Sequence, residues 1–429
     1  MLRLIPFLIC FQISAQTYFP PVNSSSWDTI SPASLGWCSD HIDSLTAFLE
    51  ANNTKAFILL KDGKIVLEKY MNDHEPSDTW YWASAGKVLT TSLIGIAEED
   101  GALSIHDPSS QYLGNGWTSL TQQEEDAITI WHQLTMTSGL NDQNVDLDCT
   151  DPACLTFLAA AGDRWSYHNA PYTLLLSVLN NAVGQTANQY INSKLHGAIG
   201  TSGIYLPVGF NQVFFSNARS MARFGLLCLA EGVWDGTTVI PSDFFNDMVN
   251  TSQTHNEAYG YLWWLNGKNS FQVPGVTFNF PGPLFEHAPN DTYAAMGLNG
   301  QFLNVSPSNG LVWIRMGESP DNSLVPITFN DQIWEKINNL PCPLNTNELN
   351  KASIKLYPNP AQSILYVDGA QDIQNIRIYD IAGREVLKQR FQTSENSVKL
   401  DIVKLAPGTY TIVYVEKNRG IQTSLFVKE

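Results

Sequence analysis

Charged residues are scarce in this 429-residue chain: Asp, Glu, Lys and Arg make up 15% of it, whereas 44% of the residues are hydrophobic. Disordered proteins and coiled coils need far more charge, so both classes are excluded. Basic residues are especially few, with 24 Lys and Arg against 41 Asp and Glu and a formal net charge of −17. Nucleic-acid backbones and anionic membranes bind clustered cations, so this chain is a poor partner for either.

Long hydrophobic runs are also missing beyond the N-terminus, so no later segment is predicted to span a membrane. The early run at residues 4–13 follows Arg3 and precedes a small residue, Ala15. This pattern is typical of a secretory signal peptide, and we expect residues 1–15 to direct export. A lipid anchor on Cys10 is disfavoured because the preceding Ile9 is not a small residue.

Cysteine is infrequent, with 6 residues, and no group of Cys and His has the spacing of a zinc site. We expect no metal and no organic cofactor. Export makes disulfides possible. Cys149 and Cys154 flank a turn-like loop and could close a small ring, whereas Cys38 and Cys342 pair only if the two ends of the main domain meet. Cys228 lies in an apolar run and is expected to be a buried thiol.

Hydrophobic patterning predicts an α+β domain over residues 27–340. A helix at 40–52 precedes a hairpin centred on Asp62-Gly63, and a long helix follows at 84–99. Residues 105–255 are mostly helical in pattern, and strands return at 259–265, 293–296, 301–305 and 311–316. The order implies an antiparallel sheet, with its first and last elements as neighbours, flanked by helices and joined to an all-helical lobe.

Residues 341–350 are rich in proline and polar residues and predict a linker. Over residues 351–429, short alternating strands are separated by the turn pairs Asn359-Pro360, Asp368-Gly369, Ala382-Gly383 and Pro407-Gly408. Strands this short and this regularly spaced predict a small all-β sandwich. It contains no plausible catalytic cluster.

Three blocks in this tail, LYPNP at 356–360, IYDIAGR at 378–384 and LAPGTY at 405–410, occur in the order found in a known export domain. The tail closely resembles the type IX secretion sorting domain of Bacteroidetes-like bacteria. The resemblance implies that secretion machinery reads this domain after a signal-driven first step, which leaves the protein secreted or at the cell surface. The alternative is a carbohydrate-binding or adhesive sandwich.

The strongest candidate for chemistry is the sequence from Ser84 to Lys87. Residues three apart on a helix share a face, and a Ser that opens the helix lies beside free N–H groups that can hold an oxyanion. Apolar residues follow Lys87, so burial is expected to lower its pKa and leave a neutral amine as the base for Ser84. About one Ser-x-x-Lys is expected by chance in such a chain, and the alternative is a helix cap beside an unrelated Lys.

The second candidate is the segment WSYHN at 165–169, before a helix predicted at 172–180. The phenol of Tyr167 could pass a proton between nucleophile and leaving group if nearby cations lower its pKa. The amide of Asn169 could hold both the Lys and a substrate carbonyl. In isolation this segment is typical of a helix-capping loop.

Together the two motifs and their flanks resemble the serine β-lactamase and penicillin-binding-protein superfamily, and within it the class C-like esterase, D-aminopeptidase and nylon-oligomer hydrolase group. Further blocks match in order between about residues 38 and 335: LSIHDP at 103–108, ITIWHQLTMTSGL at 128–140, SNARSMARFG at 216–225 and YGYLWW at 259–264. The resemblance implies that Ser84 is the acylated nucleophile, Lys87 its base and Tyr167 a second acid/base. Asn169 would complete the Tyr-x-Asn element.

The third element of that superfamily departs from its usual form. Many members carry Lys-Thr-Gly or a His variant on an edge strand, whereas residues 294–301 read AAMGLNGQ. Without a cation to grip a carboxylate, an esterase or amidase is favoured over a penicillinase or carboxypeptidase. The Gly-x-x-Gly-Gln form looks like the nylon-oligomer hydrolase branch. The resemblance places a second oxyanion donor at the backbone N–H near Leu298, beside Gly297.

The sequence therefore predicts a secreted serine hydrolase that cleaves a small-molecule ester or amide through an acyl-enzyme on Ser84. Two alternatives stay open: a β-lactamase or D,D-peptidase acting on cell-wall-like substrates, and a non-catalytic binding protein on the same scaffold. No Gly-x-Ser-x-Gly elbow and no phosphate-binding loop are present. Trp82, Trp165 and Trp263 flank the motifs and are expected to line a pocket.

Overall fold

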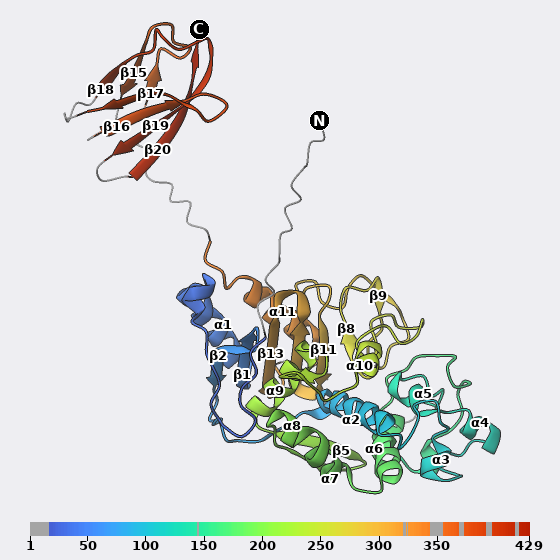
Figure 1. Cartoon of the computed structure of the whole chain (residues 1–429). Coiled ribbons are helices and arrows are strands. Elements are labelled where there is room, and N and C mark those ends of the chain that lie inside the picture. The colour runs from blue at the N-terminus through green and yellow to red at the C-terminus, as the bar shows by residue number, and fades with distance from the viewer. Residues whose placement is uncertain are drawn as a thin grey trace, which may run out of the picture. The chain divides into compact units, whose positions relative to one another are not determined.

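The computed structural model describes residues 17–143, 146–320, 323, 325–343, 355–368, 373–391, 397–416 and 420–429. The chain divides into two compact units, one ending at Cys342 and one beginning at Pro343 (Figure 1). The predicted signal peptide at 1–15 lies outside the described residues, as does most of the predicted linker at 341–350. No helix in the described ranges is long and apolar enough to cross a membrane.

A six-stranded antiparallel sheet forms the core of the first unit, in the order β2-β1-β13-β12-β11-β8. Its first hairpin pairs β1 (Thr54–Lys61) with β2 (Lys64–Tyr70). Asp62 and Gly63 both have positive φ in the turn between them, at 49° and 85°. The Asp-Gly hairpin is therefore confirmed.

The other strands of this sheet come from the end of the unit. They are β11 (Tyr293–Gly297), β12 (Gln301–Ser306) and β13 (Leu311–Gly317), and β13 pairs with β1. The first and last strands are therefore neighbours, as the sequence predicts. The strand predicted at 259–265 is much shorter, because only β8 (Trp264–Leu265) pairs with β11.

Helices α1 (Ser39–Ala51) and α11 (Ile327–Asn338) cover one face of the sheet. The rings of Phe48 and Phe329 join the two helices at 5.5 Å, and Trp334 of α11 lies 5.7 Å from Trp313 of β13. Trp313 therefore points toward this helical layer. A buried aromatic layer of this kind fixes which face of β13 each residue occupies.

Helix α9 (Ala218–Leu229) covers the opposite face. A side chain on Gly225 would come within 2.5 Å of Leu303 and 2.6 Å of Val312, so the helix packs closely on the sheet at this glycine. Val312 and Trp313 are consecutive and point to opposite faces. Because helices cover both faces, all seven residues of β13 are buried.

Two disulfides tie the first unit together. Cys38, just before α1, is bonded to Cys342, just after α11, so the two ends of the domain meet as the pairing requires. Cys149 and Cys154 close a small ring. Cys228 is a buried free thiol whose pKa burial raises. The sequence left both pairings open and the structure forms both, while the expected burial of the Cys228 thiol is confirmed.

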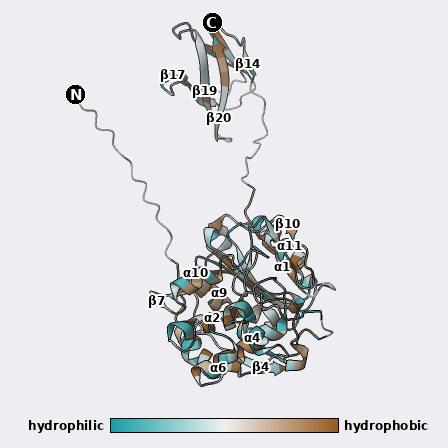
Figure 2. Cartoon of the chain, turned by 90° about the vertical axis from the view of Figure 1, so that its right-hand side faces the viewer, coloured by the Kyte–Doolittle hydropathy of each residue, from teal (hydrophilic) through white to brown (hydrophobic). Residues whose placement is uncertain are grey.

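The prediction that residues 105–255 are mostly helical is confirmed only in part, because loops and short strands make up more of this segment than its helices do. Helix α2 (Lys87–Glu99) precedes this segment. The α-helices within it, besides α9, are α3 (Ser110–Leu113), α4 (Gln122–Asp126), α5 (Ile130–Leu134), α6 (Asn169–Val183), α7 (Ala187–Ile191), α8 (Gly197–Ile199) and α10 (Ser242–Met248). Every residue of α2 from 87 to 97 is buried, and the hydropathy of this unit can be followed in Figure 2. Burial on every side places this helix in the core, although it carries the polar residues Lys87, Thr90, Thr91 and Ser92.

The structure contains one hairpin in this lobe that was not predicted from the sequence. Strands β4 (Ile204–Val208) and β5 (Asn211–Ser216) pair with each other, and β5 also pairs with β3 (Trp80–Tyr81). The two-residue turn holds Gly209 at a φ of 60°, the conformation that such hairpins require. The hairpin therefore brings the segment before Ser84 into a small three-stranded sheet.

Short elements complete the first unit: η1 (Pro32–Leu35), η2 (Ala83–Gly86), η3 (Pro152–Cys154), the π-helical η4 (Asn192–His196), η5 (Leu298–Gly300), η6 (Pro307–Asn309), β6 (Val233–Trp234), β7 (Thr237–Thr238), β9 (Ser270–Phe271) and β10 (Phe280–Pro281).

The second unit is the all-β sandwich that the sequence predicts. One sheet contains β14 (Lys355–Tyr357), β15 (Ile364–Asp368) and β18 (Ser397–Asp401); the other contains β17 (Glu385–Arg390), β16 (Ile373–Tyr379), β19 (Gly408–Glu416) and β20 (Gly420–Lys428). Apolar residues from both sheets share one core. Strands β17 and β20 were not predicted, and β17 lacks an alternating pattern because it is an exposed edge strand.

Candidate active site

Ser84 lies in the turn η2 between β3 and α2, which differs from the prediction that it opens the long helix. The α-helix begins only at Lys87, whose N–H bonds to the carbonyl of Ser84. Ala83 has a φ of 46°, a conformation that residues with a Cβ rarely adopt. The chain bends sharply there, and Ser84 is left partly exposed on a tight turn in front of a buried helix.

Lys87 lies directly beside the Ser84 hydroxyl. Its Nζ donates a hydrogen bond to Ser84 Oγ at 3.0 Å, and the residue is only 3% exposed. Burial lowers the pKa of Lys87 to about 7, although the charge of Asp148 acts in the opposite direction. A lysine with this pKa is largely uncharged just above neutral pH, and an uncharged amine can accept a proton.

Tyr167 approaches the same pair of residues. Its ring centre lies 5.2 Å from Lys87 Nζ, and its phenol is near enough to Ser84 for that residue to act on the pKa of Tyr167. Trp264 stacks on the ring at 5.9 Å. Burial raises the pKa of Tyr167, and the nearby Ser84 offsets only part of that rise. The expectation that cations lower this pKa is wrong, because desolvation dominates and the phenol keeps its proton at neutral pH.

Asn169 is the first residue of α6, and its Oδ1 accepts a hydrogen bond from Lys87 Nζ at 3.0 Å. On its other side, Asn169 Nδ2 donates to Asp148 Oδ1 at 2.8 Å. One turn further along α6, the ring of Tyr172 lies 4.0 Å from Lys87 Nζ. The start of α6 therefore supplies two of the groups that surround the amine. The sequence did not single out Asp148 or Tyr172 for this site.

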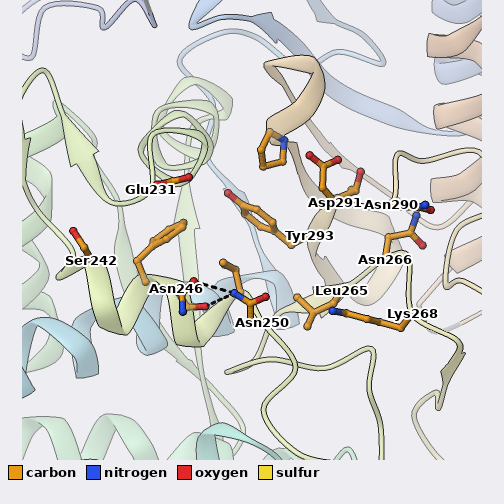
Figure 3. Close-up of a pocket in the computed structure, with 14 residues that line it drawn as sticks. Glu231, Ser242, Asn246, Asn250, Leu265, Asn266, Lys268, Asn290, Asp291 and Tyr293 are labelled. Carbon is orange, nitrogen blue, oxygen red and sulfur yellow. Dashed lines mark hydrogen bonds between the residues drawn. The ribbon is translucent and has the colours of Figure 1, made fainter. Parts of the chain in front are cut away.

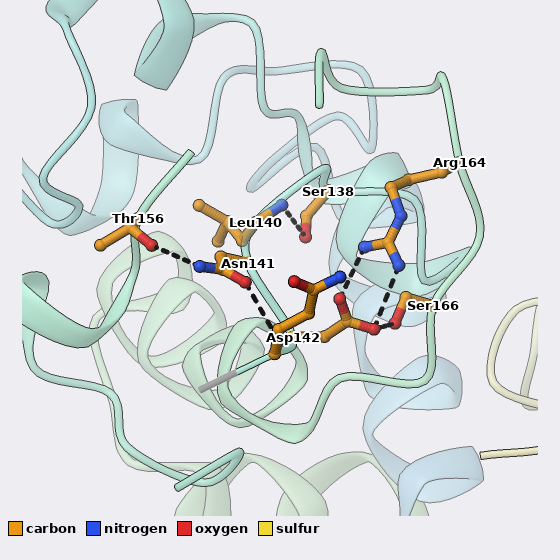
Figure 4. Close-up of polar contacts among 8 residues, drawn as sticks. Ser138, Leu140, Asn141, Asp142, Thr156, Arg164 and Ser166 are labelled. Carbon is orange, nitrogen blue, oxygen red and sulfur yellow. Dashed lines mark hydrogen bonds and ion pairs between the residues drawn. The ribbon is translucent and has the colours of Figure 1, made fainter. Parts of the chain in front are cut away.

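Figure 4 shows how the segment before Tyr167 is held. Arg164 donates two hydrogen bonds to the carboxylate of Asp142, at 2.8 and 3.2 Å, and the Ser166 hydroxyl donates to the same carboxylate. The Ser166 N–H also bonds to the carbonyl of Met136 at 2.9 Å. The block at 128–140 and the Tyr-x-Asn segment, which are separate motifs in the sequence, are therefore fastened to each other.

Gly297, at the end of β11, passes closely over the turn that holds Ser84. A Cβ on Gly297 would lie 2.5 Å from the carbonyl oxygen of Trp82, 2.9 Å from the N of Ala85 and 3.1 Å from the N of Ser84. Only glycine permits this approach. The structure thus brings Gly297 beside the backbone of Ser84, and the next residue, Leu298, is 42% exposed.

Two buried side chains hold the turn that follows Gly297. Arg315 is fully buried and donates to the carbonyls of Asn299 and Gly300 at 2.9 and 2.7 Å, while Gln301 donates to the carbonyl of Leu298 at 3.2 Å. Burial lowers the pKa of Arg315 to about 9. In the sequence, this residue is marked by being a single Arg within the otherwise apolar strand 311–317.

The three tryptophans expected to line a pocket are buried in the core, where Trp82 borders a small cavity together with Leu89 and Phe214. Trp82, Trp165 and Trp263 are 1%, 3% and 0% exposed. They are wide, apolar and next to buried helices and strands, so packing takes them inward. Trp264, which follows Trp263, is the indole that contacts Tyr167.

A cavity of about 290 Å³ lies at the other end of β11 (Figure 3). Tyr293, the first residue of that strand, lines it together with polar side chains such as Asn250, Lys268 and Asp291. Ser84 and its neighbours are not part of its wall. Among the described residues, no three His, Cys, Asp or Glu side chains are placed to hold a metal ion.

Comparison with known families gives a match for each of the two units. Residues 49–322 match the family model described as Beta-lactamase, which is more than half of the chain. The chain belongs to the beta-lactamase family. Residues 355–428 match the model of a secretion system C-terminal sorting domain. Members of the first family are serine hydrolases, and the second domain directs secretion.

Individual relatives are distant. The 6-aminohexanoate-dimer hydrolase of Paenarthrobacter ureafaciens is 21% identical over 319 residues, which cover 64% of this chain and 74% of that protein. A putative 6-aminohexanoate-dimer hydrolase from Bacillus anthracis superposes with a TM-score of 0.58 at 17% identity, covering 76% of this chain and 92% of the other. A family VIII carboxylesterase gives a TM-score of 0.53 at 14% identity, covering 71% and 99%. These structures confirm the predicted fold.

Proposed function

We propose that this chain is an exported serine hydrolase that cleaves an ester or amide bond through an acyl-enzyme on Ser84. The observation that supports this most strongly is the 3.0 Å hydrogen bond between Lys87 Nζ and Ser84 Oγ, made by an amine whose pKa burial lowers to about 7. A serine hydroxyl becomes nucleophilic when an adjacent base takes its proton. Lys87 is such a base, and it is already in contact.

Acylation follows from this geometry. Ser84 Oγ bonds to the carbonyl carbon as its proton passes to Lys87 Nζ. Negative charge then develops on the carbonyl oxygen, and the N–H groups of Ser84 and Leu298 form the oxyanion hole. The close passage of Gly297 over Ser84 supports this assignment, since it puts both backbones at one point.

Tyr167 supplies the acid. Because burial keeps its phenol protonated, Tyr167 can give its proton to the leaving oxygen or nitrogen as the bond breaks. Lys87 then returns the proton it took from Ser84 to the Tyr167 phenolate. In deacylation the same two groups accept the proton of the attacking water and return it to Ser84 Oγ. Asn169 holds Lys87 and contacts the substrate carbonyl.

The substrate class follows from what β11 lacks. Its residues at 294–297 are buried and carry no cation, so nothing on that strand grips a substrate carboxylate. Esters and amides without such an anchor are therefore favoured. The printed names of relatives, a 6-aminohexanoate-dimer hydrolase and a carboxylesterase, agree with a hydrolase.

A substrate panel tests the proposal: short-chain esters, D-amino-acid amides and the β-lactam nitrocefin, each measured with the full chain and with S84A. We expect ester or amide hydrolysis that S84A abolishes. Turnover dominated by nitrocefin would favour a β-lactamase. Folded protein with no turnover of any substrate would favour a binding protein on the same scaffold.

The export route is part of the same proposal. A signal peptide at 1–15 directs the first step, the hydrolase domain spans 27–340, and a linker at 341–350 leads to the sorting domain at 351–429. The match to a sorting domain supports this order. The substrate is then met outside the cell or at its surface.

A further inference from the structure

We propose that Asp148 is a positioning residue that orients the amide of Asn169 and so sets the basicity of Lys87. The inference rests on the proposed function of Ser84 and Lys87. Four side chains form one chain of contacts: Asp148 Oδ1 to Asn169 Nδ2 at 2.8 Å, Asn169 Oδ1 to Lys87 Nζ at 3.0 Å, and Lys87 Nζ to Ser84 Oγ at 3.0 Å.

The two ends of an amide differ in chemistry but hardly in shape. In one orientation Asn169 offers Lys87 an acceptor, its Oδ1, and in the other it offers two N–H donors. A donor facing Lys87 would compete for the lone pair that must take the Ser84 proton. A carboxylate is only an acceptor, so Asp148 selects the orientation with the amide nitrogen toward itself and the oxygen toward Lys87.

The charge of Asp148 also acts on Lys87. It raises the pKa of the amine, against the larger lowering that comes from burial. Without Asp148 the amine would lose its proton at a still lower pH. Asp148 thus has two effects on Lys87 Nζ. It keeps the Asn169 oxygen as the acceptor of the Lys87 hydrogen bond, and it limits how far burial lowers the pKa of Lys87.

Other titratable groups around this chain of contacts are neutral, paired or exposed. Burial lowers the pKa of His168 to about 4, so the imidazole is uncharged, and it raises the pKa of Tyr172 to about 12. Tyr167 likewise stays protonated. Arg164, a cation on the segment before Tyr167, is paired with Asp142 at 2.8 Å. On Asp148's own loop, Asp146 and Asp151 are exposed.

The backbone around Asp148 is well anchored. The carbonyl of Leu147 accepts the N–H of Ala170 in the first turn of α6, at 3.0 Å. The N–H of Asp148 donates to Asp146 Oδ1 at 3.0 Å. Immediately after Asp148, Cys149 closes the disulfide ring with Cys154. These ties hold the carboxylate against Asn169 before any substrate binds.

A simpler role for Asp148, stabilisation of helix α6, must be distinguished from the positioning of Asn169. An acidic residue beside the first turn of α6 would also stabilise the helix through its dipole. That role predicts a change in stability and no change in the titration of Lys87. The test therefore measures titration.

The variants are D148N, which keeps the shape and removes the charge, and D151N as the matched control, which removes the charge of an exposed Asp in the adjacent disulfide ring. The acid limb of kcat/KM is measured on a neutral ester. We expect D148N to move its midpoint to lower pH by about 0.5 to 1 unit and to lower the plateau roughly tenfold. D151N should match the wild type, and D148E should recover part of the rate.

Two outcomes overturn the positioning role. One is a D148N profile that superposes on the wild type, whatever its melting temperature. The other is a loss confined to cationic substrates, which would place Asp148 in contact with substrate. The Lys87 pKa can also be followed without activity, by NMR of lysines carrying ¹³C at Cε, with the Lys87 signal identified by its loss in K87A. An unchanged Lys87 pKa in D148N refutes the positioning role of Asp148, whether or not Ser84 is a nucleophile. The NMR titration therefore tests the role of Asp148 independently of the proposed hydrolase activity.

Discussion

At the scale of single residues, burial shifts the pKa values of Lys87 and Tyr167 in opposite directions. It lowers the pKa of Lys87 to about 7 and raises that of Tyr167. Both shifts have one cause, since desolvation penalises whichever form carries the charge. Over the same pH range, the lysine is then an uncharged base and the tyrosine a protonated acid. The two groups that flank Ser84 can therefore divide proton acceptance and donation between them.

Removing either member of the Ser84 and Lys87 pair should cost most of the activity. We expect S84A and K87A each to lower kcat by at least roughly 10³, and the double variant to lose little more, because the two groups act as a unit. Steady-state kinetics on the best ester or amide of the panel give these values. A K87A variant close to wild type would remove Lys87 as the base.

The pH dependence should report the titration of Lys87. The amine accepts a proton only when uncharged, so kcat/KM is low below its pKa and rises to a plateau above it, with a midpoint near the value of about 7. The profile is measured with an uncharged substrate. A midpoint near 10, the range of an ordinary lysine, would show that the amine is not desolvated in the working enzyme.

Close contact between η2 and β11 is the decisive feature at the scale of elements. The turn brings Ser84 forward, and the end of β11 fits over it only because residue 297 has no side chain. Arg315 and Gln301 then hold the following turn by its carbonyls. The proposed oxyanion hole depends on this pair of backbones and on no side chain of its own.

A methyl group at position 297 should disrupt that contact. In G297A the new Cβ would lie 2.5 Å from the Trp82 carbonyl oxygen, so β11 and η2 must separate. We expect kcat/KM to fall by roughly 10² or more. The control is G197A, where a Cβ has nothing within 4 Å. Thermal melting accompanies the kinetics, and a fully active G297A would exclude the proposed oxyanion hole.

Some elements could be predicted and others could not, for physical reasons. The burial of α2, and with it Lys87, follows from apolar residues at 88, 89, 93, 94 and 96, a local signal. The turn at Ser84 depends on the positive φ of Ala83, which no sequence pattern predicts. Asp148 lies between Asp146 and Asp151, in a run typical of a solvated loop. Its role arises only when α6 packs beside it.

The molecule as a whole consists of two units with separate cores. All the residues proposed to act in catalysis lie in the first unit, which the Cys38–Cys342 disulfide closes at its ends. The second unit contributes a secretion signal. Hydrolysis and export are therefore expected to be separable.

A truncated chain that ends after Pro343 should keep hydrolysis and lose export. This truncation keeps Cys342 and its disulfide, so we expect an unchanged kcat/KM in the purified protein and a loss of export from a host with the matching secretion system. Activity assays and cell fractionation measure the two effects. Loss of activity with retained folding would mean that the second unit contributes to the site.

Covalent labelling of Ser84 is the most direct test. The full chain is treated with a fluorophosphonate probe, and peptide mass spectrometry locates the adduct. We predict a single adduct on Ser84, faster above pH 7 than below it because Lys87 must be uncharged, and absent from S84A. Folded protein that takes no label, or takes it on another residue, would contradict the assignment of Ser84 as the nucleophile.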